Sequence, residues 1–291
     1  MWSVNKANFD VQVLQPTQQD LASIFSVFKT GFYEARVFRL PLLIRDRDIS
    51  MTASFKKIAL ITGASSGIGQ AAALAFAEVG VDLVLVSRSQ DKLMGVADAA
   101  RKKGVKAQVH SLDLAEIGQV RTRIAAIAAD CGPIDILVNN AGMGYTRTLM
   151  TTSLQDWQYV MDLNLTSVFQ CIQAIVPAMR DRGQGTIINV ASIAGQQTFP
   201  AWGAYSASKA ALISLSKTLS VEEKANGIRV TVVCPGAVNT SLWDTETVQV
   251  DLDRSAMLTP EAVAQSILHA ALLPDQAVIE ELTLLPSAGA L

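Results

Sequence analysis

The chain has 291 residues, half of them apolar, and its 24 lysines and arginines against 26 aspartates and glutamates give a net charge of −2. This composition excludes a disordered chain, because such chains have few apolar residues and many charges. The near-neutral balance also excludes a strongly basic nucleic-acid-binding surface. Since the cysteines (Cys131, Cys171, Cys234) and the two histidines are scattered, we expect reduced thiols, a cytoplasmic location and no metal site.

Residues 1–50 differ in composition from the rest of the chain, with five of the nine phenylalanines and one of the 18 glycines. Apolar residues recur there at helical spacing and predict a short amphipathic helix, which could dock on the body, a partner or a membrane surface (Leu21, Ile24, Phe25, Phe28, Phe32). No apolar run reaches the roughly 18 residues of a transmembrane helix. We expect an N-terminal extension, with Met51 as a candidate native start, and one domain over 51–291.

From residue 56 onward, short apolar runs alternate with helical patterns. We expect strands at Ile58–Thr62, Leu83–Val86, Ala107–Leu112, Ile136–Val138, Thr186–Val190, Arg229–Val233 and Ala277–Leu284. We expect helices at Gln70–Val79, Asp91–Lys103, Ala115–Ala129, Asp156–Arg180, Ala204–Ala225 and Glu261–Leu272. This alternation predicts an α/β fold, a doubly wound parallel sheet with helices on both faces, which binds ligands at the carboxyl ends of its strands.

A glycine-rich turn, Gly63-Ala64-Ser65-Ser66-Gly67-Ile68-Gly69, links the first strand to the first helix. Gly63 permits a tight turn, while Gly67 and Gly69 let the backbone approach a pyrophosphate and let the helix lie close to the strand. The helix N-terminus supplies free N–H groups and a partial positive charge. Glycines also mark ordinary turns, so it is the strand–turn–helix context that predicts a dinucleotide site.

Polar residues after the next strands bear on the choice of cofactor. Arg88 follows the second strand where NAD-binding proteins carry a carboxylate for the ribose, so it favours the 2′-phosphate of NADP(H) over NAD(H); the alternative is a solvated surface arginine. Asp113 could bind the adenine amino group or cap the helix that follows it. Asn140, Ala141 and Gly142 allow close approach to a ribose, but they also suit an ordinary turn.

Four side chains form a candidate catalytic group. Tyr205 and Lys209 share one helix face, and a nearby ammonium would lower the phenol pKa from its usual value near 10. Ser192, after the fifth strand, can donate a hydrogen bond to a carbonyl oxygen that gains charge. Asn164, a poor helix former, could distort its helix and hold a water linked to Lys209. The alternatives are a solvated Tyr–Lys pair, a turn or cap serine, and a satisfied helical asparagine.

The segment from Ser241 to Leu258 is the candidate substrate region. Trp243 could form the wall of an apolar pocket, although an anchor in the core is slightly favoured. Phe199 and Trp202 are candidates for the entrance. A hydrophobic ketone would fit such surroundings, and so would many small carbonyl compounds.

In this order and spacing, the glycine turn, Asn-Asn-Ala-Gly at 139–142, Asn164, Ser192, Tyr205 with Lys209, and Pro235-Gly236 with Thr240 resemble the short-chain dehydrogenase/reductase family over about residues 55–285. The resemblance implies a Rossmann-type domain with about seven strands, assembled as a homodimer or homotetramer through the helices near 156–180 and 204–225. It also implies a set of cofactor-binding residues: Gly63, Ser65, Ser66, Gly67, Ile68, Gly69, Arg88, Asp113, Leu114, Asn140, Ala141, Gly142, Tyr205, Lys209, Pro235, Gly236, Val238 and Thr240.

The resemblance further implies a role for each catalytic residue. Tyr205 is the general acid in reduction and the general base in oxidation, while Lys209 lowers its pKa and holds the nicotinamide ribose. Ser192 positions the substrate oxygen, and Asn164 anchors a relay water. The chain departs from the family pattern in its long N-terminal extension and in having Ser65 and Ser66 where some NADP-dependent members carry a basic residue.

We therefore expect an NADP-dependent oxidoreductase that transfers a hydride between the nicotinamide and a small carbonyl or alcohol substrate. One alternative is a non-catalytic nucleotide-binding regulatory protein with the same fold. Another is a membrane-associated scaffold that acts through residues 18–33, and it depends on the amphipathic stretch alone.

Overall fold

The computed structural model describes residues 56–250, 253–287 and 289, so the helix expected within 1–50 and the candidate start at Met51 lie outside the described residues. The described chain contains one seven-stranded parallel sheet with the strand order β3-β2-β1-β4-β5-β6-β7. Its strands are β1 (Ile58–Thr62), β2 (Asp82–Ser87), β3 (Ala107–Ser111), β4 (Ile136–Asn139), β5 (Gly185–Val190), β6 (Ile228–Pro235) and β7 (Glu281–Leu284). The doubly wound α/β fold is thereby confirmed.

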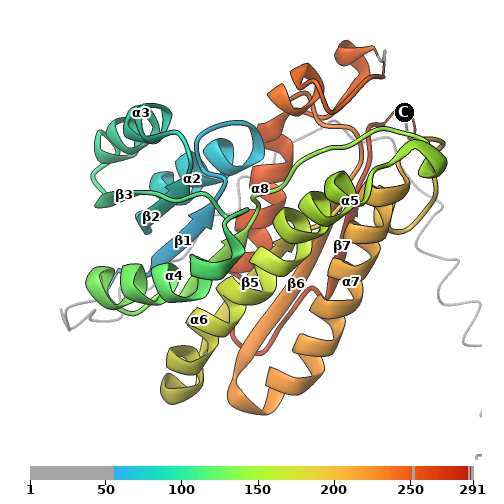
Figure 1. Cartoon of the computed structure of the whole chain (residues 1–291). Helices are drawn as coiled ribbons and strands as arrows, with labels where there is room; N and C mark the ends of the chain where they lie inside the picture. The colour runs from blue at the N-terminus through green and yellow to red at the C-terminus, as the bar shows by residue number, and fades with distance from the viewer. Residues whose placement is uncertain (1–55, 251–252, 288, 290–291) are drawn as a thin grey trace, which may run out of the picture. The chain divides into compact units, whose positions relative to one another are not determined.

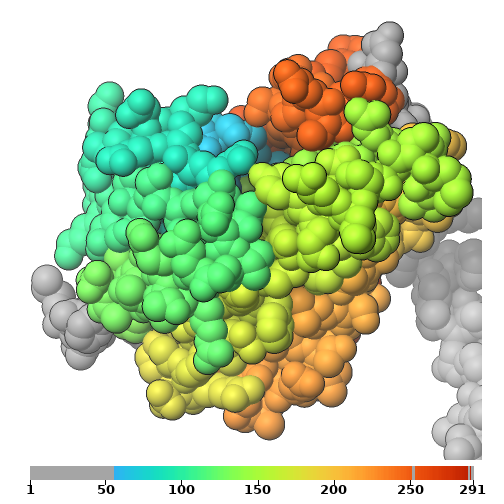
Figure 2. Space-filling model, in the orientation of Figure 1, coloured from blue at the N-terminus to red at the C-terminus, as the bar shows by residue number. Residues whose placement is uncertain are grey.

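Helices cover both faces of the sheet (Figure 1). One face carries α4 (Ile117–Cys131), α6 (Ser167–Arg182) and α7 (Gly203–Glu223), and this face is turned toward the viewer in Figures 1 and 2. The other face carries α2 (Gly67–Glu78), α3 (Gln90–Arg101) and α8 (Pro260–Ala271). Both faces of the strands are thus buried, which explains their near-continuous apolar sequences. Among the described helices, none is both long enough and apolar enough to cross a membrane.

The last strand is shorter than the expected Ala277–Leu284 and begins at Glu281. The cause is the Arg229 guanidinium, which donates hydrogen bonds to the carbonyl oxygens of Leu273, Pro274 and Ala277 at 2.6, 3.1 and 3.2 Å. These carbonyls are held in a turn around the arginine. Ala277, the first residue of the expected strand, is therefore part of this turn.

The single helix expected over Asp156–Arg180 consists of three parts. α5 (Leu154–Met161) starts earlier than expected because the Ser153 hydroxyl accepts a hydrogen bond from the Asp156 N–H. A π-helical turn, Asp162–Thr166, then leads into α6. Such turns insert one extra residue and are frequent at functional sites. The local distortion expected at Asn164 is therefore present.

Candidate active site

A cavity of about 670 Å³ opens at the carboxyl ends of the strands. It is lined by every expected cofactor-binding residue except Gly69, and also by Ser192. Residues from the ends of six strands meet there, from Ser87 and Arg88 at the end of β2 to Pro235 and Gly236 at the end of β6. Within the described ranges, no cluster of three or more His, Cys, Asp or Glu side chains could hold a metal ion.

The glycine turn is built so tightly that side chains would not fit. Gly63 has a φ of +64°, and a Cβ atom there would come within 2.9 Å of the Ala141 Cα. Gly69 lies beneath the turn, where a Cβ would overlap the Gly63 carbonyl oxygen. The Asn140 amide holds the turn by donating to the Thr62 carbonyl at 3.1 Å. Asn140 therefore shapes the turn, and its expected place near a ribose stays a prediction.

The turn presents the start of α2 to the cavity. Ser65, Ser66 and Gly67 line it, and the Ser66 side chain makes no capping hydrogen bond to the helix. The first N–H groups of a 12-residue helix are thus not occupied by a side-chain cap. This concave, glycine-lined helix start fits a pyrophosphate group.

The far end of the cavity carries positive charge. Arg88 and Lys92 both line it and are exposed, and Ser89 between them precedes the first turn of α3. Sequence reasoning identified Arg88 but missed Lys92 and Ser89. No helical spacing links the two cations, because Arg88 lies before α3 and Lys92 lies in its first turn.

Asp113 also lines this end of the cavity. Its carboxylate accepts a hydrogen bond from the Ala115 N–H at 2.9 Å. The alternative that Asp113 caps the following helix is wrong, because α4 begins at Ile117 after Glu116. The carboxylate closes the preceding turn instead, and its expected contact with adenine stays a prediction.

The candidate catalytic side chains converge at the other end of the cavity. Tyr205 and Lys209 project from the first turns of α7, with the Lys209 Nζ 5.8 Å from the centroid of the Tyr205 ring. The Lys209 ammonium donates to the Val190 carbonyl oxygen at 2.9 Å. Ser192 follows β5, and its hydroxyl oxygen accepts from the Ala194 N–H at 3.1 Å. The serine is therefore a cap and also part of the cavity wall.

Burial controls the ionisation of this group. Desolvation raises the pKa of the Tyr205 phenol, and the hydrogen bond with the Ser192 hydroxyl acts in the opposite direction. Desolvation lowers the pKa of Lys209 to about 8. The ammonium is directed to the Val190 carbonyl, so the expectation that Lys209 lowers the pKa of Tyr205 stays a prediction.

Asn164 lies behind the cavity and is fully buried. Its amide accepts from the Met143 N–H at 2.8 Å and donates to the Met143 carbonyl at 3.0 Å and to the Ser208 hydroxyl at 3.1 Å. The alternative of a satisfied asparagine is therefore confirmed, and so is the expected distortion of its helix. The relay water stays a prediction. Gly142 lies against it, since a Cβ there would be 3.1 Å from the Asn164 Oδ1.

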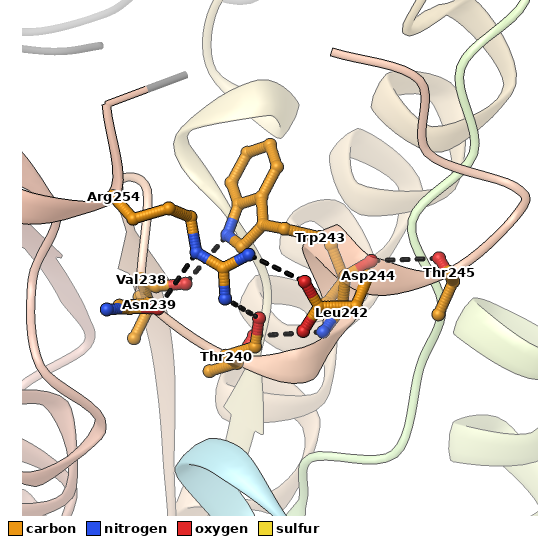
Figure 3. A network of polar contacts seen from close by, with 8 residues as sticks. All are labelled: Val238, Asn239, Thr240, Leu242, Trp243, Asp244, Thr245 and Arg254. Carbon is orange, nitrogen blue, oxygen red and sulfur yellow. Dashed lines mark hydrogen bonds and ion pairs between the residues drawn. The ribbon is translucent and has the colours of Figure 1, made fainter. Parts of the chain in front are cut away.

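The segment that follows β6, from Gly236 to Val250, contributes many residues to the lining of this end of the cavity. A Cβ on Gly67 would come within 3.0 Å of the Thr240 methyl group, so the segment reaches the glycine turn. Trp243 lines the cavity and is half-buried, so its expected place in the core is wrong and the alternative, a pocket wall, is right. The indole N–H is the reason, because it donates to the Val238 carbonyl at 2.8 Å and holds the ring at the surface of the fold (Figure 3).

Arg254 does not line the cavity, but it holds the same segment in place through hydrogen bonds. Its guanidinium donates to the Asn239 side chain at 2.9 Å, the Thr240 carbonyl at 2.8 Å and the Asp244 carboxylate at 2.9 Å (Figure 3). Sequence reasoning missed this residue. No local pattern connects it to partners 10 to 15 positions earlier in an irregular segment.

Comparison with known proteins places these features in a family. Residues 57–250 match the family model for short chain dehydrogenases. A glycine betaine reductase of Emericella nidulans is 34% identical over 79% of the chain, but the match covers only 19% of that protein. An uncharacterized oxidoreductase of Mycobacterium bovis is 39% identical over 74% of the chain and 63% of its own length. The 3-oxoacyl-[acyl-carrier-protein] reductase of Staphylococcus epidermidis is 39% identical over 62% of the chain and 75% of its own length.

Solved structures agree with these relatives. An alcohol dehydrogenase from the archaeon Thermococcus sibiricus, complexed with 5-hydroxy-NADP, has a TM-score of 0.72 and 30% identity. The alignment covers 79% of this chain and 96% of that one. A metagenomic short-chain oxidoreductase in complex with NADP has a TM-score of 0.70 and 30% identity over 79% of this chain and 97% of its own. The chain belongs to the short chain dehydrogenase family of oxidoreductases.

Proposed function

We propose that the chain is an NADP(H)-dependent oxidoreductase that transfers a hydride between the nicotinamide and a carbonyl or alcohol carbon. One observation carries this proposal. Tyr205, Ser192 and Lys209 reach the same cavity whose other half is the glycine turn. A nucleotide-binding protein without catalytic activity has no chemical need for a phenol, a hydroxyl and a buried ammonium at this place.

The positive charge of Arg88 and Lys92, at the end of the cavity far from Tyr205, supports the choice of NADP(H). The cavity lining between Ser87 and Lys92 includes Arg88 and no carboxylate. A guanidinium and an ammonium suit a 2′-phosphate, and a ribose 2′-hydroxyl is normally bound by a carboxylate. The NADP-bound relatives are consistent with this choice. When bound, NADPH supplies the hydride.

The chain itself orients the substrate and moves the proton. The Ser192 hydroxyl donates a hydrogen bond to the carbonyl oxygen, which gains negative charge as the carbon is reduced. The Tyr205 phenol gives its proton to that oxygen, so a ketone becomes an alcohol and the tyrosine becomes a phenolate. Lys209 places a positive charge near the phenolate and stabilises it. In oxidation the same phenolate takes the proton from the alcohol.

NADPH consumption over a panel of ketones and aldehydes tests the reaction. We expect the wild type to reduce members of the panel and Tyr205→Phe to lose about two to four orders of magnitude in rate, the usual contribution of a general acid. Equal rates in both proteins would contradict the role of Tyr205. Binding of NADPH without turnover of any ketone would favour the regulatory alternative.

Cofactor choice has its own test. We expect Arg88→Ala to lower the ratio of NADPH to NADH affinity about tenfold or more, because a charge-assisted hydrogen bond is worth about 1.5–3 kcal/mol. Arg123→Ala, an exposed arginine outside the cavity, serves as the control. An unchanged ratio in Arg88→Ala would contradict the assignment of NADP(H).

We also propose a homo-oligomer that associates through α6 and α7. Each helix exposes a large apolar side chain, with Phe169 44% and Val221 79% accessible. Sedimentation of the full chain is expected to give a dimer or tetramer, and Phe169→Glu is expected to weaken it. A wild-type monomer at micromolar concentration would contradict this proposal.

A further inference from the structure

The substrate end of the cavity contains a row of three aromatic rings. The Trp202 ring packs edge-to-face on Tyr205, with centroids 5.2 Å apart and planes at 66°. It also packs edge-to-face with Trp243, at 5.8 Å and 69°. Both tryptophans line the cavity and keep part of their surface accessible. The reacting phenol is thus continuous with an aromatic surface, which we call the aromatic wall (Trp202 and Trp243).

The backbone immediately before Trp202 is strained. Ala201 has a φ of +68°, the only positive value among the described non-glycine residues. A non-glycine residue in this region costs about 1 kcal/mol or more and persists only where its surroundings hold it. Here the Ala201 carbonyl accepts a hydrogen bond from the Arg147 N–H at 2.7 Å. Strained residues of this kind cluster at ligand sites.

Trp243 is also held in place, because the one polar atom of its side chain, the indole nitrogen, is already hydrogen-bonded. Its indole N–H is bonded to the Val238 carbonyl, and Arg254 holds the segment on both sides of it (Figure 3). The accessible part of the ring is therefore an apolar face. A rigid aromatic face favours flat apolar groups, which bind by stacking or edge contacts.

Charge is distributed unevenly along the cavity. The charged residues of the lining are Arg88, Lys92 and Asp113 at the far end, and Lys209 beneath Tyr205. The rest of the described lining is apolar or uncharged, and it includes Phe199, Pro200, Leu242 and Val250 as well as the two tryptophans. A substrate carboxylate or phosphate placed here would lose its hydration without gaining a cation.

We propose that the substrate is an uncharged ketone, or the matching secondary alcohol, with an aromatic or flat polycyclic apolar group next to the reacting carbon. This inference rests on the proposed function and adds the substrate class to it. The ring lies against the aromatic wall, which directs the carbonyl oxygen toward Tyr205 and Ser192. Keto acids and phosphorylated carbonyl compounds are poor substrates, because their charged groups would lose hydration at the aromatic wall without gaining a cation.

The test compares three ketones with the NADPH-loaded enzyme: acetophenone, 2-octanone, which matches it in carbon count, and the derivative 4-carboxyacetophenone. We expect kcat/KM to be highest for acetophenone and at least about tenfold lower for its carboxylate derivative, which corresponds to about 1.4 kcal/mol. Trp243→Leu is expected to lower the ratio of kcat/KM for acetophenone to that for 2-octanone about tenfold, and Trp243→Phe to restore most of it. The control is Tyr159→Leu, an exposed aromatic residue of α5 outside the cavity, which is expected to leave the ratio unchanged.

A binding measurement makes the test independent of turnover. Acetanilide, which is not reduced, is titrated calorimetrically into wild type and Trp243→Leu in the presence of NADP, and weaker binding to the variant is expected. Equal ratios of kcat/KM in wild type and Trp243→Leu, or equal turnover of acetophenone and its carboxylate derivative, would overturn the substrate class and leave the proposed function standing. No reduction of any ketone, with acetanilide still bound at the wall, would instead overturn the proposed function.

Discussion

Asn164 binds both main-chain polar groups of Met143, with its Oδ1 2.8 Å from the Met143 nitrogen and its Nδ2 3.0 Å from the Met143 oxygen. A buried asparagine thus replaces the partner strand that an extended backbone would otherwise need. This pairing fixes the chain just after Gly142, where the cavity wall passes close to Lys209. The π turn of the helix brings the amide to this position.

We predict that Asn164→Leu lowers the free energy of unfolding by about 1–3 kcal/mol, because the Met143 N–H and carbonyl lose their buried partners. Ser208→Ala is the matched control, since it removes one bond to the same amide and is expected to cost less. Urea denaturation of both variants measures the difference. A stability of Asn164→Leu equal to that of the wild type would show that the pairing contributes nothing.

Two glycines in different helices, Gly69 and Gly95, should respond oppositely to substitution by alanine. Gly95→Ala in α3 meets open space and is expected to stabilise the fold by about 0.5–1 kcal/mol through helix propensity. Gly69→Ala in α2 gains the same propensity, but its methyl group would overlap the Gly63 carbonyl. We expect a net loss of stability and at least about tenfold weaker NADPH binding. Thermal unfolding and fluorescence titration measure both, and NADPH affinity in Gly69→Ala equal to that of Gly95→Ala would be the contrary result.

Lys209 makes stability depend on pH. Its folded-state pKa of about 8 lies below the ordinary value of 10.5, so in this interval the unfolded chain binds more protons than the folded one. Stability contributed by this group therefore rises with pH, by about 3 kcal/mol across the whole interval. We predict that the unfolding free energy of the wild type, minus that of Lys209→Met, increases from pH 8 toward pH 10. A difference that stays flat or falls would mean that Lys209 is not desolvated.

Arg254 is predicted to act on catalysis through the segment that it fastens. Arg254→Ala removes hydrogen bonds to Asn239, Thr240 and Asp244 and is expected to raise KM for the ketone about tenfold, with a smaller change in kcat. Arg254→Lys should recover part of the loss. Asp244→Asn, which weakens one exposed ion pair, should change KM about twofold at most. Steady-state kinetics separate these effects, and a fall in kcat with KM unchanged would refute a positioning role.

The parts of the site that follow from local sequence were predictable. The glycine turn, the i, i+4 pair of Tyr205 and Lys209, and the serine after β5 depend on spacing within one element or one turn, and the parallel sheet then brings them together. Apolar runs likewise gave the central strands. Strand boundaries were harder to predict, as β7 shows, because the Arg229 side chain of a neighbouring strand holds Ala277 in a turn.

The remaining parts depend on contacts that no local pattern encodes. The place of Trp243 is set by a carbonyl five residues away in an irregular segment and by a tryptophan at the start of α7. Ala201 has a positive φ, and its carbonyl accepts a hydrogen bond from the N–H of Arg147, far away in the chain. Asn164 stood out as a poor helix former, but only the fold supplies its partner Met143. Such tertiary contacts explain why the substrate end was harder to predict than the cofactor end.

The central claim is that Tyr205 transfers the proton while the rest of the site binds. Single-turnover kinetics test it most directly: NADPH-loaded wild type and Tyr205→Phe are mixed with acetophenone, and NADPH affinity is measured on the same proteins. We predict similar NADPH affinities and a reduction rate about two to four orders of magnitude lower in the variant. A variant that reduces the ketone at the wild-type rate would contradict the account.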